Sequence, residues 1–266
     1  EWSVRLPSAL LAIAGILVCY GYVRRLFNDR AALIAALILG TSVQYLQAGS
    51  GARVDTTLTF FLEIAFFEFI MCAEGLTHRR MPMYVAIAMA VLSKGPVGAV
   101  LPAAVAAVWI VLERRWRLIR ELDVVRGAIV VAVLAGWWYV AASIVGGHAF
   151  IDKQLLSENV VRFVGASHFH EGHAHPFYYL ELALMAGMLP WTPLAALLMV
   201  RAARAPRPMD SRLKYLLVWF MVVLVFYSVA HSKRGVYLLS LYPALATILA
   251  LYLDDAIRDR SVGGSL

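Results

Sequence analysis

The sequence has little charge and almost no cysteine. Only 15% of its 266 residues are Asp, Glu, Lys or Arg, and 62% are hydrophobic, whereas soluble domains have about 25% charged and about 45–50% apolar residues. Cys19 and Cys72 each lie in an apolar stretch, so no disulfide framework is indicated. Glycine-rich nucleotide loops and the HExxH helix motif are absent. These deficits exclude soluble nucleotide-binding folds and predict an all-α integral membrane protein.

The net charge of +7 does not indicate a nucleic-acid partner. Lys and Arg collect on the cytoplasmic side of membrane proteins, and a positive balance is therefore usual for this class. Membrane lipids are the expected surroundings.

Nine apolar segments divide the chain, and most have the length of about 17–25 residues that a membrane-spanning helix needs. They are roughly Ser8–Val23, Ala31–Gln47, Thr56–Cys72, Pro82–Leu92, Val97–Leu112, Gly127–Val145, Phe177–Val200, Tyr215–Ala230 and Val236–Leu253. The fourth is too short to span, and it ends at Ser93-Lys94-Gly95-Pro96. Two short helices meeting at such a break predict a cavity at membrane depth, because irregular backbone is tolerated there only beside protein or water.

The distribution of basic residues predicts the orientation. With nine crossings and Glu1 outside, 17 of the 24 Lys and Arg fall in inner loops and 7 on the outer side. This asymmetry favours an outer N-terminus and a cytoplasmic C-terminus. The charges of the inner loops are interpreted as topology signals.

The ends of the sequence indicate a part of a longer protein. It begins at Glu1 without an initiator Met or a signal-peptide pattern, and it ends in a polar tail. Residues 1–266 are expected to form a single transmembrane domain.

Chemistry-bearing residues gather in the connections assigned to the outer side. Asp55 at the start of the third segment is either an acid favoured by the helix dipole or the partner of Lys94. Lys94 either snorkels to water from a re-entrant turn or holds an anionic group such as phosphate at the helix break. Glu63, two turns below Asp55, is expected to face the same cavity.

Two further groups have equally open interpretations. Glu158 and Arg162 are spaced i, i+4 and form either a surface ion pair or the roof of a cavity with Arg162 turned to a phosphate. Lys233 and Arg234, followed by Tyr237, form either an anion site or an interfacial anchor.

Four histidines lie within eight residues of the loop 157–179, and they end at His173 and His175. Imidazoles are common ligands of divalent metals, but this spacing matches no standard zinc signature. The loop is therefore either a metal site, with His175 the best-placed ligand, or a polar loop.

Seven short motifs resemble the membrane domain of bacterial GT-C glycosyltransferases, close to the lipid A aminoarabinose transferase and protein O-mannosyltransferase families. They are RLPSALLA at 5–12, GARVDTTLTFF at 51–61, LSKGPVGAVLP at 92–102, ENVVRF at 158–163, HPFYYL at 175–180, GMLPW at 187–191 and SKRGVYLLSLYPALA at 232–246. They occur in the family order over nearly the whole chain.

The resemblance implies transfer of a sugar from a polyprenyl-phosphate carrier to a lipid or protein acceptor at the outer face. Asp55 would match the family acid that pairs with Lys94 of the KG motif. The carrier phosphate would lie among Lys94, Arg162 and Lys233, and His175 would match a histidine that helps to hold a divalent ion. The family's principal catalytic acid lies in a first outer loop, and the first helix and that loop would precede residue 1.

Two other classes of function share some of these features. A transporter or flippase for a lipid-linked substrate also has broken helices and charges at membrane depth, but it should show inverted repeats and polar groups at both faces. A non-catalytic lipid-binding subunit is the third hypothesis.

Overall fold

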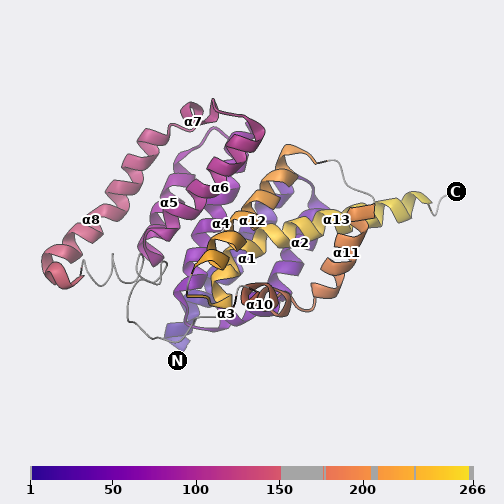
Figure 1. Cartoon of the computed structure of the whole chain (residues 1–266), viewed down its shortest axis with the longest axis horizontal. Helices are drawn as coiled ribbons and strands as arrows, with labels where there is room; N and C mark the ends of the chain where they lie inside the picture. The colour runs from indigo at the N-terminus through magenta and orange to yellow at the C-terminus, as the bar shows by residue number, and fades with distance from the viewer. Residues whose placement is uncertain (1, 151–175, 177, 205–208, 231, 264–266) are drawn as a thin grey trace.

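The computed structural model describes residues 2–150, 176, 178–204, 209–230 and 232–263, and every regular element in them is helical. The elements in chain order are α1 (Trp2–Leu26), α2 (Asp29–Thr41), α3 (Val43–Ser50), α4 (Val54–Ala73), α5 (Met81–Lys94), α6 (Val97–Glu113), α7 (Leu118–Glu121), α8 (Val124–Phe150), α10 (Tyr179–Gly187), α11 (Thr192–Arg204), α12 (Ser211–Val229), the 3₁₀ helix η2 (Gly235–Leu241) and α13 (Tyr242–Gly263). Figure 1 shows α8 beside α5 at one edge of the bundle, and α11 near the opposite edge.

Five helices in the described residues are long and apolar enough to cross a membrane, and two bent pairs raise this number to seven. The helices α2 and α3 meet at 63°, and α10 meets the first part of α11 at 107°. The helices α5 and α6 are apolar but shorter. The expected all-α membrane fold is confirmed, and the count of nine crossings stays a prediction.

Aromatic rings of α4, α6 and α12 form one cluster within a largely aliphatic core. Trp219 packs on Phe66 with ring centroids 4.5 Å apart, and Tyr215 packs on Phe69 at 5.4 Å. Trp219 donates its indole hydrogen bond to the Ser240 carbonyl at 3.0 Å. Such buried rings fix neighbouring helices because they combine a large apolar area with a directed polar bond.

The predicted break between α5 and α6 is confirmed, and its residues explain it. Gly95 has a positive φ of 83°, which glycine adopts without a steric penalty because it has no Cβ atom. Pro96 then precedes α6, where its missing N–H costs no helical bond. At Gly98 the two helices touch, because a Cβ atom there would lie 2.4 Å from the Ala90 carbonyl carbon.

The two bends are joined to each other. The amide of Val43 donates to the Leu189 carbonyl at 3.0 Å, and the Trp191 indole donates to Thr41 Oγ1 at 2.8 Å. Each bend therefore receives polar partners from the other, as broken helices at membrane depth require.

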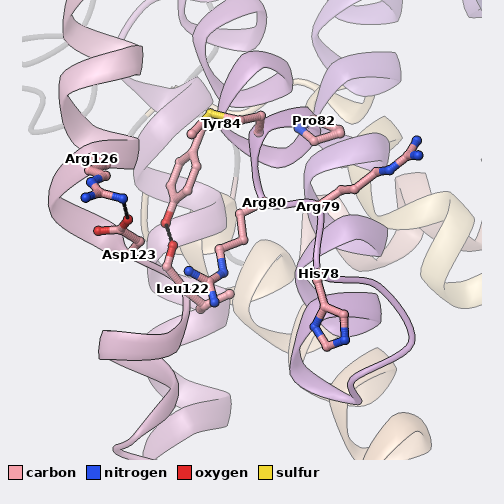
Figure 2. A pocket seen from close by; sticks show the side chains of 9 residues that line it. His78, Arg79, Arg80, Pro82, Tyr84, Leu122, Asp123 and Arg126 are labelled. Carbon is pink, nitrogen blue, oxygen red and sulfur yellow. Dashed lines mark hydrogen bonds and ion pairs between the residues drawn. The ribbon is translucent and has the colours of Figure 1, made fainter.

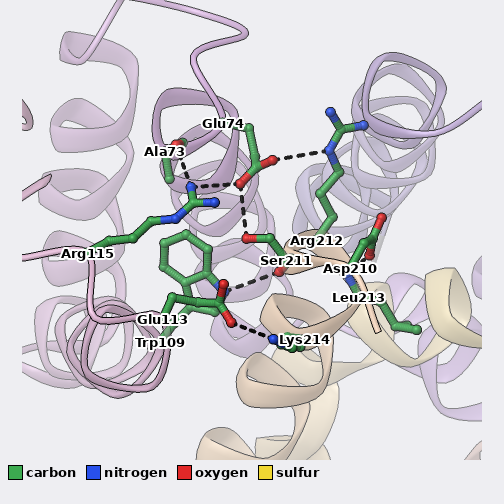
Figure 3. Close-up of polar contacts among 10 residues, drawn as sticks. All are labelled: Ala73, Glu74, Trp109, Glu113, Arg115, Asp210, Ser211, Arg212, Leu213 and Lys214. Atoms are coloured by element: carbon green, nitrogen blue, oxygen red, sulfur yellow. Dashed lines mark hydrogen bonds and ion pairs between the residues drawn. The ribbon is translucent and has the colours of Figure 1, made fainter. Parts of the chain in front are cut away.

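The Arg-rich end of the bundle is held together by a polar network centred on Glu74 (Figure 3). Its carboxylate accepts from Arg115 Nη1 at 3.0 Å and from Ser211 Oγ at 3.1 Å, and it pairs with Arg212 at 3.5 Å. Beside it, Lys214 pairs with Glu113 at 2.9 Å. The network connects the ends of α4 and α6 to the start of α12, so these charges stabilise the fold in addition to any role as topology signals.

Replacing Glu74 with Gln is expected to lower the free energy of unfolding by about 1–2 kcal/mol, because charge-assisted hydrogen bonds to its carboxylate are lost. The loss is modest because the donors of these bonds are partly exposed to water. The thermal unfolding midpoint in detergent measures this change. The control is Glu121→Gln on α7, whose side chain is exposed. Equal midpoints for both variants would show that the network contributes nothing.

Candidate functional site

Asp55 and Lys94 form an ion pair at the opposite end of α4 from Glu74. Asp55 lies in the first turn of α4 and Lys94 is the last residue of α5, positions at which the helix dipoles favour an acid and a base respectively. Lys94 Nζ donates a hydrogen bond to Asp55 Oδ1. The two side chains are 30% and 19% exposed. Of the alternatives left open by the sequence, pairing is confirmed.

The ring of Tyr237 also contacts the lysine. Lys94 Nζ lies 4.1 Å from the ring centroid, within the range of a cation–π interaction. Tyr237 belongs to η2 and packs on Tyr227 of α12, with ring centroids 5.4 Å apart. Lys94 is therefore held by a carboxylate and a ring, and its charge is already compensated by the protein.

A cavity of about 640 Å³ adjoins this pair. It is lined by the first residues of α3 and α4, the link between these helices, α10 and the start of η2, which contribute Val43, Gln44, Gln47, Ala52, Arg53, Val54, Asp55, Tyr179, Ala183, Ala186, Gly187, Arg234, Gly235 and Val236. The bend between α2 and α3 and the α10 end of the other bent pair thus form part of its wall.

Arg53 and Arg234 are the cations of the cavity wall, and both side chains are exposed. No ion pair joins either of them to another residue in the described part of the chain. The backbone of Arg53 is tied to α1, because its amide donates to Ser8 Oγ at 3.2 Å. With Gln44 and Gln47 nearby, the wall offers donors to an anionic group.

The other predicted site residues divide into two groups. Lys233 is buried, with 8% of its surface exposed, and it does not line the cavity. Glu158, Arg162, His173 and His175 lie outside the described residues. Sequence reasoning assigned no site role to Arg53 or Gln44, although the position of Arg53 two residues before Asp55 was an available signal.

Glu63 does not share the cavity with Asp55, and that expectation was wrong. Its side chain is fully buried, and neither carboxyl oxygen has a hydrogen-bond partner in the described part of the chain. Eight residues of helix separate it from Asp55, and its neighbours include Tyr45 and Gly15. Glu68 likewise turns inward, where Tyr22 donates to it at 2.5 Å.

Metal binding by this chain stays a prediction. Within the described ranges, no group of three or more His, Cys, Asp or Glu side chains is arranged to hold an ion. The histidines on which the prediction depends lie between residues 151 and 175, outside these ranges.

Residues 1–155 match a protein family described as dolichyl-phosphate-mannose-protein mannosyltransferase. An Aquifex aeolicus protein without an assigned function is 28% identical over 96% of this chain and 49% of its own length. The undecaprenyl phosphate-alpha-4-amino-4-deoxy-L-arabinose arabinosyl transferase of Erwinia tasmaniensis is 28% identical over 94% of this chain and 45% of its own length. The chain thus spans about half the length of the curated relatives it matches.

The fold is also similar to that of a solved structure. The crystal structure of ArnT from Cupriavidus metallidurans bound to undecaprenyl phosphate superposes with a TM-score of 0.82 at 27% identity, covering 96% of this chain and 46% of ArnT. Together with the apolar helices, this similarity identifies a multi-pass membrane protein.

Proposed function

Because this chain belongs to the dolichyl-phosphate-mannose-protein mannosyltransferase family, we propose that the whole protein is a GT-C glycosyltransferase. It moves a sugar from a polyprenyl-phosphate carrier to a lipid or protein acceptor at the outer face of the bacterial inner membrane. The relatives named as undecaprenyl phosphate-aminoarabinose arabinosyl transferases support a polyprenyl-phosphate-linked donor.

One observation carries the proposal. A cavity lined by Arg53 and Arg234, neither of which forms an ion pair within the described part of the chain, adjoins the Asp55–Lys94 pair, in a fold that is similar to a protein solved with undecaprenyl phosphate bound. A lipid phosphate is an anion that must be stabilised at the level of the headgroups, and exposed guanidinium groups suit it because they donate two parallel hydrogen bonds.

The proposed step is a displacement at the anomeric carbon of the sugar. The acceptor attacks this carbon and loses its proton to a base, while the bond from the carbon to the phosphate oxygen breaks and its electron pair leaves with the lipid phosphate. Arg53 and Arg234 would stabilise the leaving phosphate, as fixed cations do for developing charge. Asp55 and Lys94 would neutralise each other's charge, and the phosphate would be positioned beside this ion pair.

The orientation follows from the same proposal. The cavity end carries the outer connections of the sequence count, and the Glu74 end carries the Arg-rich inner loops. Between them α4 has 20 residues, which span about 30 Å, the thickness of the hydrocarbon core. A divalent ion bound by His173 and His175, and a phosphate contact from Arg162, remain parts of the proposal.

Arg234→Gln in the full-length protein is expected to raise the KM for the lipid-linked donor about tenfold, since one charge-assisted bond to the phosphate is worth about 1.5 kcal/mol. The assay uses vesicles containing the protein, undecaprenyl-phosphate-linked aminoarabinose as donor and lipid A as acceptor. Arg117→Gln, an exposed arginine at the Glu74 end, is the matched control and should behave as wild type.

Two outcomes would contradict the proposal. One is a wild-type KM for Arg234→Gln, which would remove the arginine from the phosphate site. The other is movement of the donor across the vesicle membrane without sugar transfer, which would favour a transporter.

A further inference from the structure

A second pocket lies at the opposite end of the bundle from the proposed transferase cavity. It has a volume of about 370 Å³ and is formed where the segment before α5 meets the start of α8. Figure 2 shows Arg80 and Arg126, from these two segments, on either side of the bond between Tyr84 and Leu122. The transferase proposal uses neither of these residues.

The pocket has an excess of positive charge. His78, Arg79, Arg80 and Arg126 line it, and Asp123 is the one acid among the described residues of its lining. That acid pairs with Arg126 at 3.1 Å. Neither Arg79 nor Arg80 forms an ion pair with any residue in the described ranges, so among these residues the cations of the pocket outnumber its acid. The first turn of α5 adds the positive end of its helix dipole.

The rest of the wall is rigid and apolar. Tyr84 donates its hydroxyl hydrogen bond to the Leu122 carbonyl at 2.8 Å. Its ring lies against Gly127, where a Cβ atom would come within 2.0 Å of the ring. Tyr84 therefore fixes α5 against α8. Because its hydroxyl is already hydrogen-bonded, it would contact a bound molecule through its ring.

An apolar stripe runs from the pocket toward the middle of the membrane. Met81 lines the pocket, and Val85 and Met89 follow at intervals of four residues on the same face of α5. These three side chains are 50%, 42% and 37% exposed. A cationic pocket at the end of an exposed apolar stripe matches a molecule with an anionic head and a long hydrocarbon chain.

We propose that this pocket binds an anionic glycerophospholipid of the leaflet at the Arg-rich end, with its phosphate between Arg80 and Arg126 and one acyl chain along the Met81–Val85–Met89 face. A headgroup without an amine fits best, since an ammonium would meet the uncompensated arginines. Clusters of Arg beside spanning helices attract such lipids with about 1 kcal/mol per residue.

The test is a lipid titration of the full-length protein in detergent, followed by native mass spectrometry. Dioleoyl-phosphatidylglycerol and dioleoyl-phosphatidylcholine are the two probes. Wild-type protein is expected to bind the first more tightly, and Arg80→Gln is expected to weaken that binding about fivefold. Arg117→Gln removes the same charge at the same end without touching the pocket, and it should leave the affinity unchanged.

Val85→Ser separates a lipid from a free phosphate. It should weaken phosphatidylglycerol binding, and millimolar inorganic phosphate should not displace the lipid from wild-type protein. The proposal is overturned if Arg80→Gln and Arg117→Gln weaken binding equally, if phosphatidylcholine binds as tightly as phosphatidylglycerol, or if inorganic phosphate displaces the lipid.

Discussion

Replacing Lys94 with Met in the full-length protein is expected to lower sugar transfer about 10²–10³-fold, the usual cost of removing a group that stabilises charge at a reaction centre. Without the lysine, the Asp55 carboxylate stands uncompensated in the wall of the cavity. It would then repel the phosphate that the cavity is proposed to bind. Transfer rates measured in vesicles at saturating acceptor give the effect.

The activity of the double variant distinguishes this explanation from a direct contact between Lys94 and the phosphate. If Lys94 acts by neutralising Asp55, adding Asp55→Asn to Lys94→Met should recover part of the lost activity. If Lys94 instead donates directly to the reacting phosphate, the double variant should be no better than Lys94→Met. Lys214→Met removes a lysine from a similar pair with Glu113 at the other end of the bundle, and it should leave transfer unchanged.

Gly98→Ala is expected to lower the free energy of unfolding by about 3 kcal/mol, at the upper end of overpacking effects. The new methyl group would lie 2.4 Å from the Ala90 carbonyl carbon, and backbone cannot rotate away as a side chain can. Since Lys94 lies on the same helix as Ala90, the displacement should also disturb the pair with Asp55.

Gly136→Ala is the matched control for this substitution. Gly136 also lies within a helix, and a Cβ atom there meets nothing within 4 Å. The variant should be stabilised by about 0.5–1 kcal/mol, because alanine loses less backbone entropy than glycine in a helix. Thermal unfolding in detergent compares the two, and similar midpoints would show that α5 and α6 do not meet as closely as described.

The sequence predicted those features that depend on local chemistry. Apolar segments long enough to span, and the glycine–proline break after Lys94, follow from the cost of exposing polar backbone to lipid. The pairing of Lys94 with Asp55 was one of two interpretations left open, and the cost of an isolated charge at membrane depth was the reason to consider it. The helix boundaries confirm the break, and the contact between the two side chains confirms the pairing, whereas the number of crossings stays a prediction.

Features that depend on distant partners could not be predicted. The bends at Ser42 and near Leu189 are satisfied by hydrogen bonds between two segments far apart in the chain. Because these long-range bonds cannot be read from the sequence, the segments Ala31–Gln47 and Phe177–Val200 were predicted as continuous helices. Arg53 escaped notice as a site residue because a cation beside an apolar segment usually marks only the membrane interface.

The contact between the two bends has a consequence for biosynthesis. The amide of Val43 bonds to the carbonyl of Leu189, which comes much later in the chain. The first bent span is therefore synthesised long before the segment that supplies its hydrogen-bond partner. Until then its amide at the bend must be satisfied by water or lipid headgroups, and the wall that α10 supplies is missing. A nascent chain therefore completes the wall of the proposed donor cavity only after α10 has been inserted.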